Sequence, residues 1–340
     1  MRARRLRAAL KGWGGVGAMA VVCALALAFV LLLPRTQSHG VSPGPEGGRL
    51  ARGTQAKADD CKDADAQNQS PSPSSGAGGD TSHIDAIKAR GYLTVGVDQN
   101  GYRWGYRNPN NASGELEGFD IDLAHRIAKD ILGDPDKVQF KAIPTNERIP
   151  AIKSDRVDMV VRTMTITCDR LQQVAFSAPY FLTGQQVLAP KTSAITGYDK
   201  TLAGQKICSA QGSTAYDHLS ADRKSGTLPA STDISTTVPN QLDCLVRLQL
   251  GEVDAVVTDG ALAASQAAQD PTVELKGATF TKEYYGVAMK RGSDDLVRQV
   301  NRILENYRKD GGWKASYDKW LAPTLGRDSE SATPPAAIYK

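Results

Sequence analysis

The feature that most limits the fold of this chain is an alternation of strand-like and helix-like segments, which begins near Ile84. Residues 92–97, "YLTVGV", predict a buried strand, and residues 118–134 place apolar side chains on one face of a helix. A second series includes the strands "KICSA" (206–210) and "VDAVVTD" (253–259), with helical segments beside them. This order of elements is typical of an α/β protein.

Two of the predicted strands lie in similar surroundings. Residues 154–163, "SDRVDMVVRT", and residues 251–260, "GEVDAVVTDG", share the pattern V-D-x-V-V, followed by polar residues at the end of the strand. Open α/β sheets bind ligands at the carboxyl ends of their strands, so the repeat is compatible with two halves that share a ligand. The same pattern also serves simply to pack a strand, and by itself it does not decide between these interpretations.

Length and charge narrow the classes of function. With 340 residues, the chain is long enough for two domains, each with its own core. Its net charge is +4, but five cationic residues precede residue 12, so the remainder is close to neutral and we expect no nucleic-acid partner. The sequence contains no C-x-x-C pair, cysteine–histidine spacing or glycine-rich phosphate loop, and we expect neither a metal site nor a cofactor.

Residues 12–33 form an uncharged apolar segment that is long enough to span a bilayer, with the preceding basic residues on the inner side. Two interpretations are open, a retained membrane anchor and a cleaved signal peptide. We favour the anchor, because the segment is longer than a signal core and no A-x-A-like site follows it. Lipidation of Cys23 is disfavoured because Val22 is not small. In either case the rest of the chain lies outside the cytoplasm, held on the outer face of the membrane or secreted.

The segment 144–170, "PTNERIPAIKSDRVDMVVRTMTITCDR", places Arg148, Arg162 and Arg170 close to threonines and between apolar runs. A cation near a protein core is unfavourable by several kcal/mol unless an anion pairs with it. These side chains therefore predict an anionic partner.

Five segments resemble, in this order, the amino-acid-binding solute-binding proteins of ABC importers, and among these the glutamate-binding proteins of Gram-positive actinobacteria. They are "LTVGVDQN", "GELEGFDIDLAHRIAKDI", "RIPAIKSDRVDMVVRTMTITCDRLQQVAFSAPYF", "GQKICSAQGST" and "GEVDAVVTDGALA". The resemblance runs from about Ile84 to Leu321, roughly 70% of the chain. It implies an extracytoplasmic protein that binds one amino acid and delivers it to an ABC permease in the membrane.

The resemblance also implies an architecture, the two-lobed periplasmic-binding-protein-like fold of type II. Its two α/β lobes are joined by two hinge crossover strands, here "QVLAPK" (186–191) and "YYGVAMK" (284–290), and they close on the ligand. With the composition of the N-terminal part, we expect a basic segment and anchor or signal (1–33), a flexible extracytoplasmic linker rich in Gly, Pro and Ser (34–83), lobe 1 (84–187), lobe 2 (188–285), a return to lobe 1 (286–323) and a C-terminal tail (324–340).

Ligand contacts carry over residue by residue. Arg170 matches the arginine that pairs with the α-carboxylate of the ligand, and a planar guanidinium fits a carboxylate. Thr165 matches a hydroxyl and N–H donor to the same carboxylate, and Thr163 matches a carbonyl acceptor for the α-ammonium. Asp259, at the end of a strand, matches the acid for that ammonium. The alternatives are an ordinary surface arginine and a turn aspartate.

The residues Gly212, Ser213 and Thr214 match a turn of the second lobe at the start of a helix. Exposed N–H groups and the helix dipole make such a turn suitable for a carboxylate. A plain N-cap is the alternative, although capping and ligand binding can coexist.

Thr145 and Arg148 bear on which amino acid binds. A hydroxyl followed three residues later by arginine resembles binders of acidic amino acids, and a second cation near Arg170 needs a second carboxylate, which glutamate and aspartate possess. A solvent-facing arginine at the start of a helix is the alternative. Asp98 departs from this pattern, because an acid suits the amide of glutamine or asparagine. Arg162 is assigned no ligand contact.

Four cysteines follow the apolar segment, and an even number in an oxidising compartment predicts disulfides. We expect Cys208 to pair with Cys244, because in a βαβ arrangement the helix that carries Cys244 packs on the small sheet that contains Cys208. Two free buried thiols are the alternative. By elimination, Cys61 could then pair with Cys168.

Two other classes of function stay open. The same lobe closure could signal to a membrane partner instead of loading a permease, and a retained anchor would suit that role. Some periplasmic dehydratases share this fold, but no Ser-His-Asp order or metal set points to catalysis here. We expect a binding protein and not an enzyme, with glutamate preferred and aspartate, glutamine or asparagine as further candidates.

Overall fold

The computed structural model describes residues 69–73 and 80–339 of the chain. Within these ranges, no helix combines the length and the apolar character that a membrane crossing needs. The predicted anchor at residues 12–33, Cys61 and most of the predicted linker lie outside the described residues.

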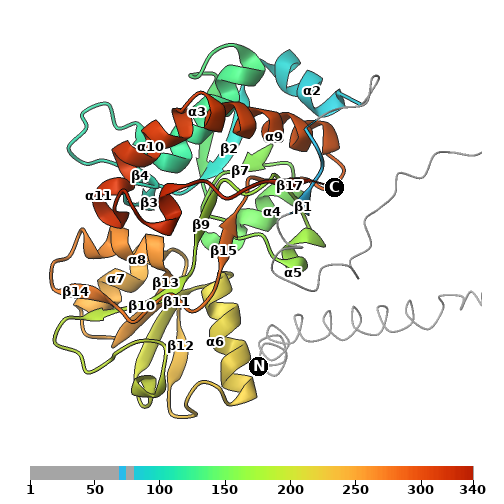
Figure 1. Cartoon of the computed structure of the whole chain (residues 1–340). Helices are drawn as coiled ribbons and strands as arrows, with labels where there is room; N and C mark the ends of the chain where they lie inside the picture. Colours follow the sequence, from blue (N-terminus) through green and yellow to red (C-terminus); the bar gives the residue numbers. More distant parts are fainter. Residues whose placement is uncertain (1–68, 74–79, 340) are drawn as a thin grey trace, which may run out of the picture. The chain divides into compact units, whose positions relative to one another are not determined.

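The first lobe is built on a five-stranded sheet whose strands come from two separate parts of the chain (Figure 1). β2 pairs in parallel with β6 and β7, whereas β16 comes much later in the sequence and lies antiparallel between β7 and β8. The lobe is therefore discontinuous in sequence. Its strands are β6 (Val138–Ala142), β2 (Leu93–Val97), β7 (Met159–Val160), β16 (Ala288–Met289) and β8 (Ala175–Phe176).

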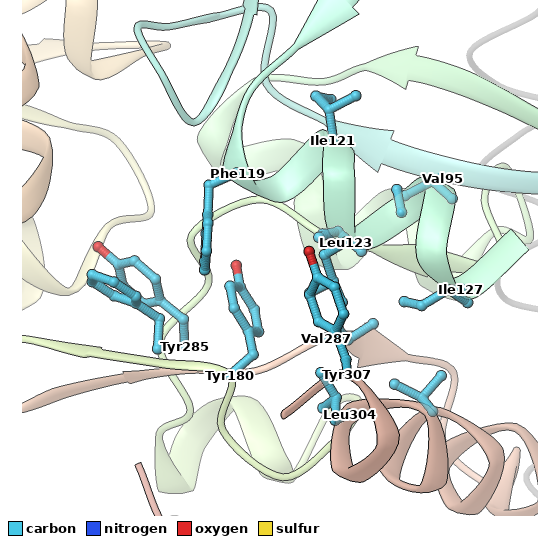
Figure 2. Close-up of a cluster of buried hydrophobic side chains, with 14 of the residues drawn as sticks. Val95, Phe119, Ile121, Leu123, Ile127, Tyr180, Tyr285, Val287, Leu304 and Tyr307 are labelled. Carbon is cyan, nitrogen blue, oxygen red and sulfur yellow. The ribbon is translucent and has the colours of Figure 1, made fainter. Parts of the chain in front are cut away.

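Helices α3 and α9 supply much of the core of this lobe. The apolar face of α3, including Ile121 and Ile127, is buried as its 3.6-residue spacing predicts, and Figure 2 shows these side chains in one cluster with Leu304 of α9. The helices of the lobe are α2 (Ser82–Arg90), α3 (Phe119–Leu132), α4 (Arg148–Lys153), α5 (Cys168–Leu171), α9 (Asp294–Lys309), α10 (Gly312–Trp320) and α11 (Ala322–Leu325).

The second lobe has its own five-stranded sheet in the order β12-β11-β13-β10-β14, all from one continuous stretch. Alternate residues face opposite sides, so Ile207 packs in the cluster that includes α6 residues, and Cys208 in the cluster that includes α7 residues. Its elements are β10 (Gln185–Pro190), β11 (Lys206–Ala210), α6 (Thr214–Ser225), β12 (Asp233–Val238), α7 (Gln241–Gln249), β13 (Ala255–Asp259), α8 (Gly260–Ala267) and β14 (Val273–Lys276).

The predicted disulfide of the second lobe is present. Cys208 on β11 and Cys244 on α7 are bonded, both side chains are fully buried, and their Cα atoms are 5.6 Å apart. The reason given for the pairing is confirmed as well, since α7 packs on the sheet that contains β11. Cys61 lies outside the described residues, so its pairing with Cys168 stays a prediction.

Two antiparallel strands, β9 (Phe181–Thr183) and β15 (Glu283–Tyr285), run between the sheets of the two lobes (Figure 1). Of the segment 186–191, which was expected to be the first crossover, residues 186–190 instead lie in β10 within the second sheet, so the first crossing occurs a few residues earlier. The apolar character of 186–191 reflects burial between β13 and β14. The expected fold class, two α/β lobes with two crossings, is confirmed.

Part of the predicted linker is held on the first lobe. β1 (Gln69–Ser70) pairs in parallel with β17 (Ile338–Tyr339). The hydroxyl of Ser70 is buried and donates to the carbonyl of Phe176 at 2.9 Å, and the amide of Asn301 donates to Ser70 Oγ and to the carbonyl of Pro71. Composition alone assigns residues 69–73 to the linker, because it does not register these long-range contacts.

Shorter elements complete the description. A three-stranded sheet precedes α3, and three 3₁₀ turns connect larger elements within the described residues. These elements are β3 (Asn100–Gly101), β4 (Gly105–Arg107), β5 (Leu116–Glu117), η3 (Thr145–Glu147), η4 (Lys200–Leu202) and η5 (Glu330–Ala332).

Candidate functional site

A pocket lies between the two lobes. Both strands that share the V-D-x-V-V pattern, β7 and β13, lead into it, and the starts of α4, α6 and α7 complete its walls. The lining residues are Arg148, Thr163, Thr165 and Arg170 from the first lobe and Ser213, Thr214, Ala215, Gln241, Thr258 and Asp259 from the second.

Arg148 is the first residue of α4, and its side chain is almost fully buried. Its Nε donates to the carbonyl of Thr145 at 2.9 Å, and its Nη1 to the carbonyls of Arg162 and Thr163 at 3.3 and 3.2 Å. Its Nη2 reaches across to the second lobe and donates to the carbonyl of Gly212 at 3.2 Å. Four backbone carbonyls thus hold this guanidinium at the pocket wall.

Arg170 reaches the same carbonyl from α5. Its Nη1 donates to the carbonyl of Thr165 at 2.7 Å and its Nη2 to that of Gly212 at 3.1 Å. Only glycine suits position 212, because its φ is 73° and a Cβ atom there would come within 3.0 Å of the Asn146 backbone. Two guanidinium groups of the first lobe therefore meet at one carbonyl oxygen of the second.

In the part of the chain that the structure describes, these two cations lack an anionic partner. Among the described residues, no carboxylate oxygen lies within 4.0 Å of either guanidinium. Burial lowers the pKa of Arg148 well below its ordinary value, and the charges of Arg170 and Arg162 lower it further. Burial also lowers the pKa of Arg170. The charges of nearby carboxylates, of which Glu283 has the largest effect, act in the opposite direction and raise it. Because a neutral carbonyl cannot balance two buried positive charges, the pocket favours an anion.

The start of α6 adds hydrogen-bond donors on the opposite wall. Ser213 Oγ accepts from the N–H of Tyr216 at 3.2 Å and caps the helix, and the Thr214 hydroxyl donates to Glu283 Oε2 at 3.1 Å. The first N–H groups of a helix have no acceptor within it, so the backbone of Thr214 and Ala215 offers donors at the pocket. The N-cap interpretation is confirmed for Ser213, and ligand contact at this turn stays a prediction.

Asp259 supplies the acid of the pocket at the end of β13. It is only 7% exposed, and the hydroxyl of Tyr285, on the crossing strand β15, donates to its Oδ2. Burial, followed by the nearby charge of Glu283, raises the pKa of Asp259 to about 7. Such a carboxylate gains from a cation beside it, and a bound ammonium would supply one.

Thr163 and Thr165 lie on the segment that follows β7, and both are buried. Thr163 has a φ of 40°, in the left-handed region, and its N–H donates to Asp120 Oδ2 at 3.0 Å. Thr165 pairs with Tyr285 in an isolated antiparallel bridge, which ties the pocket to β15. The structure thus brings both predicted threonines to the pocket.

Thr145 and Asp98, in contrast, do not line this pocket. Asp98 lines a separate cavity, together with Trp104 and Gln266, and its carboxylate lies 3.1 Å from Nη2 of Arg162. The hydroxyl of Thr145 accepts from Nη1 of the same arginine at 3.0 Å. The partner of Arg162 is thus a carboxylate of this chain, and Thr145 supports Arg148 through its backbone carbonyl.

Three lining residues, Ala215, Gln241 and Thr258, were not predicted as ligand contacts. Ala215 directly follows the predicted Thr214, and Thr258 directly precedes the predicted Asp259. Extending each motif by one residue would therefore have found both. Gln241, the first residue of α7, belongs to no motif, and only the packing of α7 against the first lobe brings it there.

The pocket as a whole combines cations and N–H donors from both lobes with one buried carboxylate of the second lobe. Two guanidinium groups and the start of α6 suit carboxylate oxygens, and Asp259 suits an ammonium group. An α-amino acid carries both groups on one carbon. Among the residues that the structure describes, no cluster of three or more His, Cys, Asp or Glu side chains could hold a metal ion.

Comparison with known proteins agrees with this chemistry. Residues 93–323 match the bacterial extracellular solute-binding proteins, family 3. The glutamine-binding protein GlnH of a Bacillus subtilis ABC transporter is 35% identical over 70% of this chain and 84% of its own length. The glutamate-binding protein GluB of Corynebacterium efficiens is 29% identical over 74% of this chain and 86% of its own. An ancestral arginine-binding protein, solved with glutamine bound, aligns with a TM-score of 0.61 at 37% identity, over 68% of this chain and 98% of that one.

Proposed function

Because this chain belongs to the bacterial extracellular solute-binding proteins of family 3, we propose that it captures glutamate outside the cytoplasm and delivers it to an ABC permease. The single observation that carries the choice of ligand is the pair of buried guanidinium groups, Arg148 and Arg170, with no carboxylate partner among the described residues. Glutamate brings two carboxylates to two unpaired cations.

In the proposed complex, each polar group of the ligand has its own partner. The α-carboxylate pairs with Arg170 and accepts from Thr165, and the α-ammonium donates to Asp259 and to the carbonyl of Thr163. The ammonium lowers the pKa of Asp259 by supplying the positive charge that this buried acid lacks. The side-chain carboxylate then pairs with Arg148. Each of the three charged groups of the ligand thus pairs with a side chain of opposite charge.

Glutamine is the second candidate, because two relatives of this chain are glutamine-binding proteins and one aligned structure contains glutamine. Asp98 also favoured an amide ligand in the sequence. Its carboxylate, however, is paired with Arg162 and faces a different cavity, which removes that reason for preferring an amide. Aspartate offers two carboxylates on a shorter side chain, and asparagine offers the shorter amide.

Calorimetric titration of the purified protein against these four amino acids tests the proposal. We expect glutamate to bind most tightly. Arg148→Ala should weaken glutamate by about ten- to a hundredfold and glutamine far less, because a charged hydrogen-bond pair contributes about 1.5–3 kcal/mol. Arg170→Ala should weaken both ligands alike. Arg156→Ala, at an exposed arginine that pairs with Glu147, is the matched control. Equal losses of glutamate and glutamine in Arg148→Ala would remove the side-chain assignment.

Attachment to the membrane through residues 12–33 and delivery to a permease belong to the same proposal. Deleting the gene should slow growth on glutamate as the sole nitrogen source if the protein loads a permease. Unchanged growth together with a lost transcriptional response to glutamate would favour the signalling alternative. We also propose binding without turnover, so glutamate recovered from the complex should be chemically unchanged by mass spectrometry.

A further inference from the structure

A strained residue lines the pocket. Among the described residues, only Arg103, Asp155 and Thr163 have a positive φ without being glycine, and Thr163 is the β-branched one. A β-branched side chain is strongly disfavoured in the left-handed region, and such a conformation persists only where surrounding contacts hold it. The contacts that hold Thr163 are therefore part of the architecture of the pocket.

The peptide between Arg162 and Thr163 is held from both sides. Its N–H donates to Asp120 Oδ2 at 3.0 Å, and its carbonyl accepts from Arg148 Nη1 at 3.3 Å. In a planar trans peptide the N–H and the carbonyl point in opposite directions. Fixing the N–H on Asp120 therefore turns the carbonyl toward Arg148. The next carbonyl, that of Thr163, accepts from the same Nη1 at 3.2 Å.

Asp120 is itself rigidly placed. It is the second residue of α3 and 1% exposed, and the hydroxyl of Tyr180 donates to its Oδ1 at 2.9 Å. Figure 2 shows Tyr180 beside Phe119, the neighbour of Asp120 in α3. Each carboxylate oxygen therefore accepts one hydrogen bond, and neither reaches the pocket, which Asp120 does not line.

We propose that Asp120 is a positioning residue for ligand binding, which holds the Arg162–Thr163 peptide so that its carbonyls orient the guanidinium of Arg148. The inference rests on the proposed function in assuming that Arg148 contacts the ligand. Asp120 acts through the peptide and through Arg148 and has no contact with the ligand.

The burial of this carboxyl group supports a dedicated role. Burial raises the pKa of Asp120 to about 7, the charge of Asp98 raises it further, and the hydrogen bonds from Tyr180 and Thr163 and the charge of Arg162 lower it. A buried acid is unfavourable for folding, and an apolar residue at the same place would not carry this penalty. The hydrogen bond to a strained pocket residue gives a reason for an acid at this position.

A double-mutant cycle tests the inference with whichever amino acid the wild type binds most tightly. Asp120→Ala should weaken binding about tenfold in the wild-type background and less than about threefold in an Arg148→Ala background, because coupled residues give non-additive effects. Asp120→Asn should recover most of the loss, since its amide oxygen still accepts from the Thr163 N–H and its amide group can donate to the Tyr180 oxygen.

Asp122→Ala is the matched control. Asp122 lies two residues further along α3 and accepts hydrogen bonds from Ser316 and Trp320, so its loss removes a comparable polar network that does not lead to the pocket. It should lower the melting temperature and leave affinity unchanged.

The outcomes separate the two proposals. Equal losses from Asp120→Ala in both backgrounds would overturn the positioning role, and so would an equal loss of affinity from Asp122→Ala. If Asp120→Ala does not fold, Asp120→Asn tests the positioning role instead. If Asp120→Asn loses as much affinity as Arg148→Ala, the charge of Asp120 matters and its acceptor oxygen does not, which would overturn the proposal. If the wild type binds none of the common amino acids, the proposed function fails instead.

Discussion

The guanidinium of Arg162 lies 3.1 Å from the carboxylate of Asp98, and this pair sits apart from the candidate ligand pocket. Arg162 is fully buried, and it also donates to Asn240 Oδ1 of the second lobe at 2.9 Å. Arg162 of the first lobe is thus paired with a carboxylate of its own lobe and also contacts Asn240 of the second lobe. The pair therefore helps to hold the two lobes in the arrangement that the structure describes.

The first prediction follows from this pair. Asp98→Ala leaves Arg162 buried without its carboxylate, and breaking a buried ion pair typically destabilises a protein by about 3–5 kcal/mol. We expect a clear fall in melting temperature, with the ratio of glutamate to glutamine affinity unchanged. Asp136→Ala, at a carboxylate that is 88% exposed, should have almost no effect on either. A changed ligand ratio in Asp98→Ala would return Asp98 to the ligand site.

Asp259→Asn should separate binding from stability. The variant loses the negative charge opposite the ligand ammonium, so we expect an affinity about ten- to a hundredfold lower. Without ligand, however, it should be at least as stable as the wild type at pH 7.5, because a buried acid near Glu283 is unfavourable when ionised. Thermal melting with and without glutamate measures both effects. A large loss of stability in the ligand-free variant would contradict this account.

The pH dependence of the same variant has a defined sign. The pKa of Asp259 is raised from an ordinary value of 3.8 to about 7, so between these pH values the folded protein binds more protons than the unfolded chain. Its contribution to stability is therefore complete below about pH 4 and lost as the pH rises through about 7. Relative to the wild type, ligand-free Asp259→Asn should gain stability across this window, as denaturant titrations at several pH values would measure. A difference independent of pH would refute the shift.

The disulfide should support both the stability and the shape of the second lobe. Cys208 and Cys244 are 36 positions apart, and closing a loop of that length contributes about 4 kcal/mol in the chain-entropy model. We expect a Cys208→Ala/Cys244→Ala double variant to melt well below the wild type. Affinity should fall modestly, because β11 leads into the Gly212 turn and α7 carries Gln241. Reductant should lower the melting temperature of the wild type by more than that of the double variant, in which any bond from Cys168 is still present.

Residues 69–73 should stabilise the first lobe. A chain that starts at residue 80 lacks the Ser70 and Pro71 acceptors of the buried Asn301 amide, whereas a chain that starts at residue 69 keeps them. We expect the shorter chain to be less stable by about 1–3 kcal/mol, with glutamate affinity unchanged, because none of these residues lines the pocket. Both chains lack Cys61, which makes the comparison a matched one. Equal melting temperatures would show that these contacts are unimportant.

Much of the fold could be predicted from the sequence, because the signals involved are local. The buried face of α3 and the apolar runs of β2 and β13 follow from spacing alone. The Cys208–Cys244 bond needed one further step, the packing of a helix on a neighbouring strand. The family resemblance, and not local spacing, assigned Arg148, Arg170 and Asp259 to the ligand, and the structure brings all three to one pocket.

The parts that were missed depend on distant contacts. Asp98 and Arg162 are neighbours only after β2 and β7 pair, so no local pattern identifies Asp98 as the partner of that arginine. The left-handed conformation of Thr163 has no sequence signal, because threonine is unfavourable there and the carboxylate that accepts from its N–H belongs to Asp120, which is distant in the sequence. The hydrogen bond between Asn301 and Ser70 joins residues that are 231 positions apart in the sequence.

The position of β16 between β7 and β8 has a consequence for the order in which the chain can fold. Every strand of the second sheet lies between Gln185 and Lys276, so that lobe is complete before β16 has been synthesised. The first sheet lacks an interior strand, and the lobe lacks α9, until the chain is nearly finished. A chain that is synthesised from its N-terminus can therefore complete the second lobe before the first. Until β16 is made, the strands β7 and β8 of the first lobe keep unpaired edges. Unpaired strand edges can pair with other chains and cause aggregation. An export route that keeps the whole chain unfolded until its last residues have crossed the membrane would avoid this exposure.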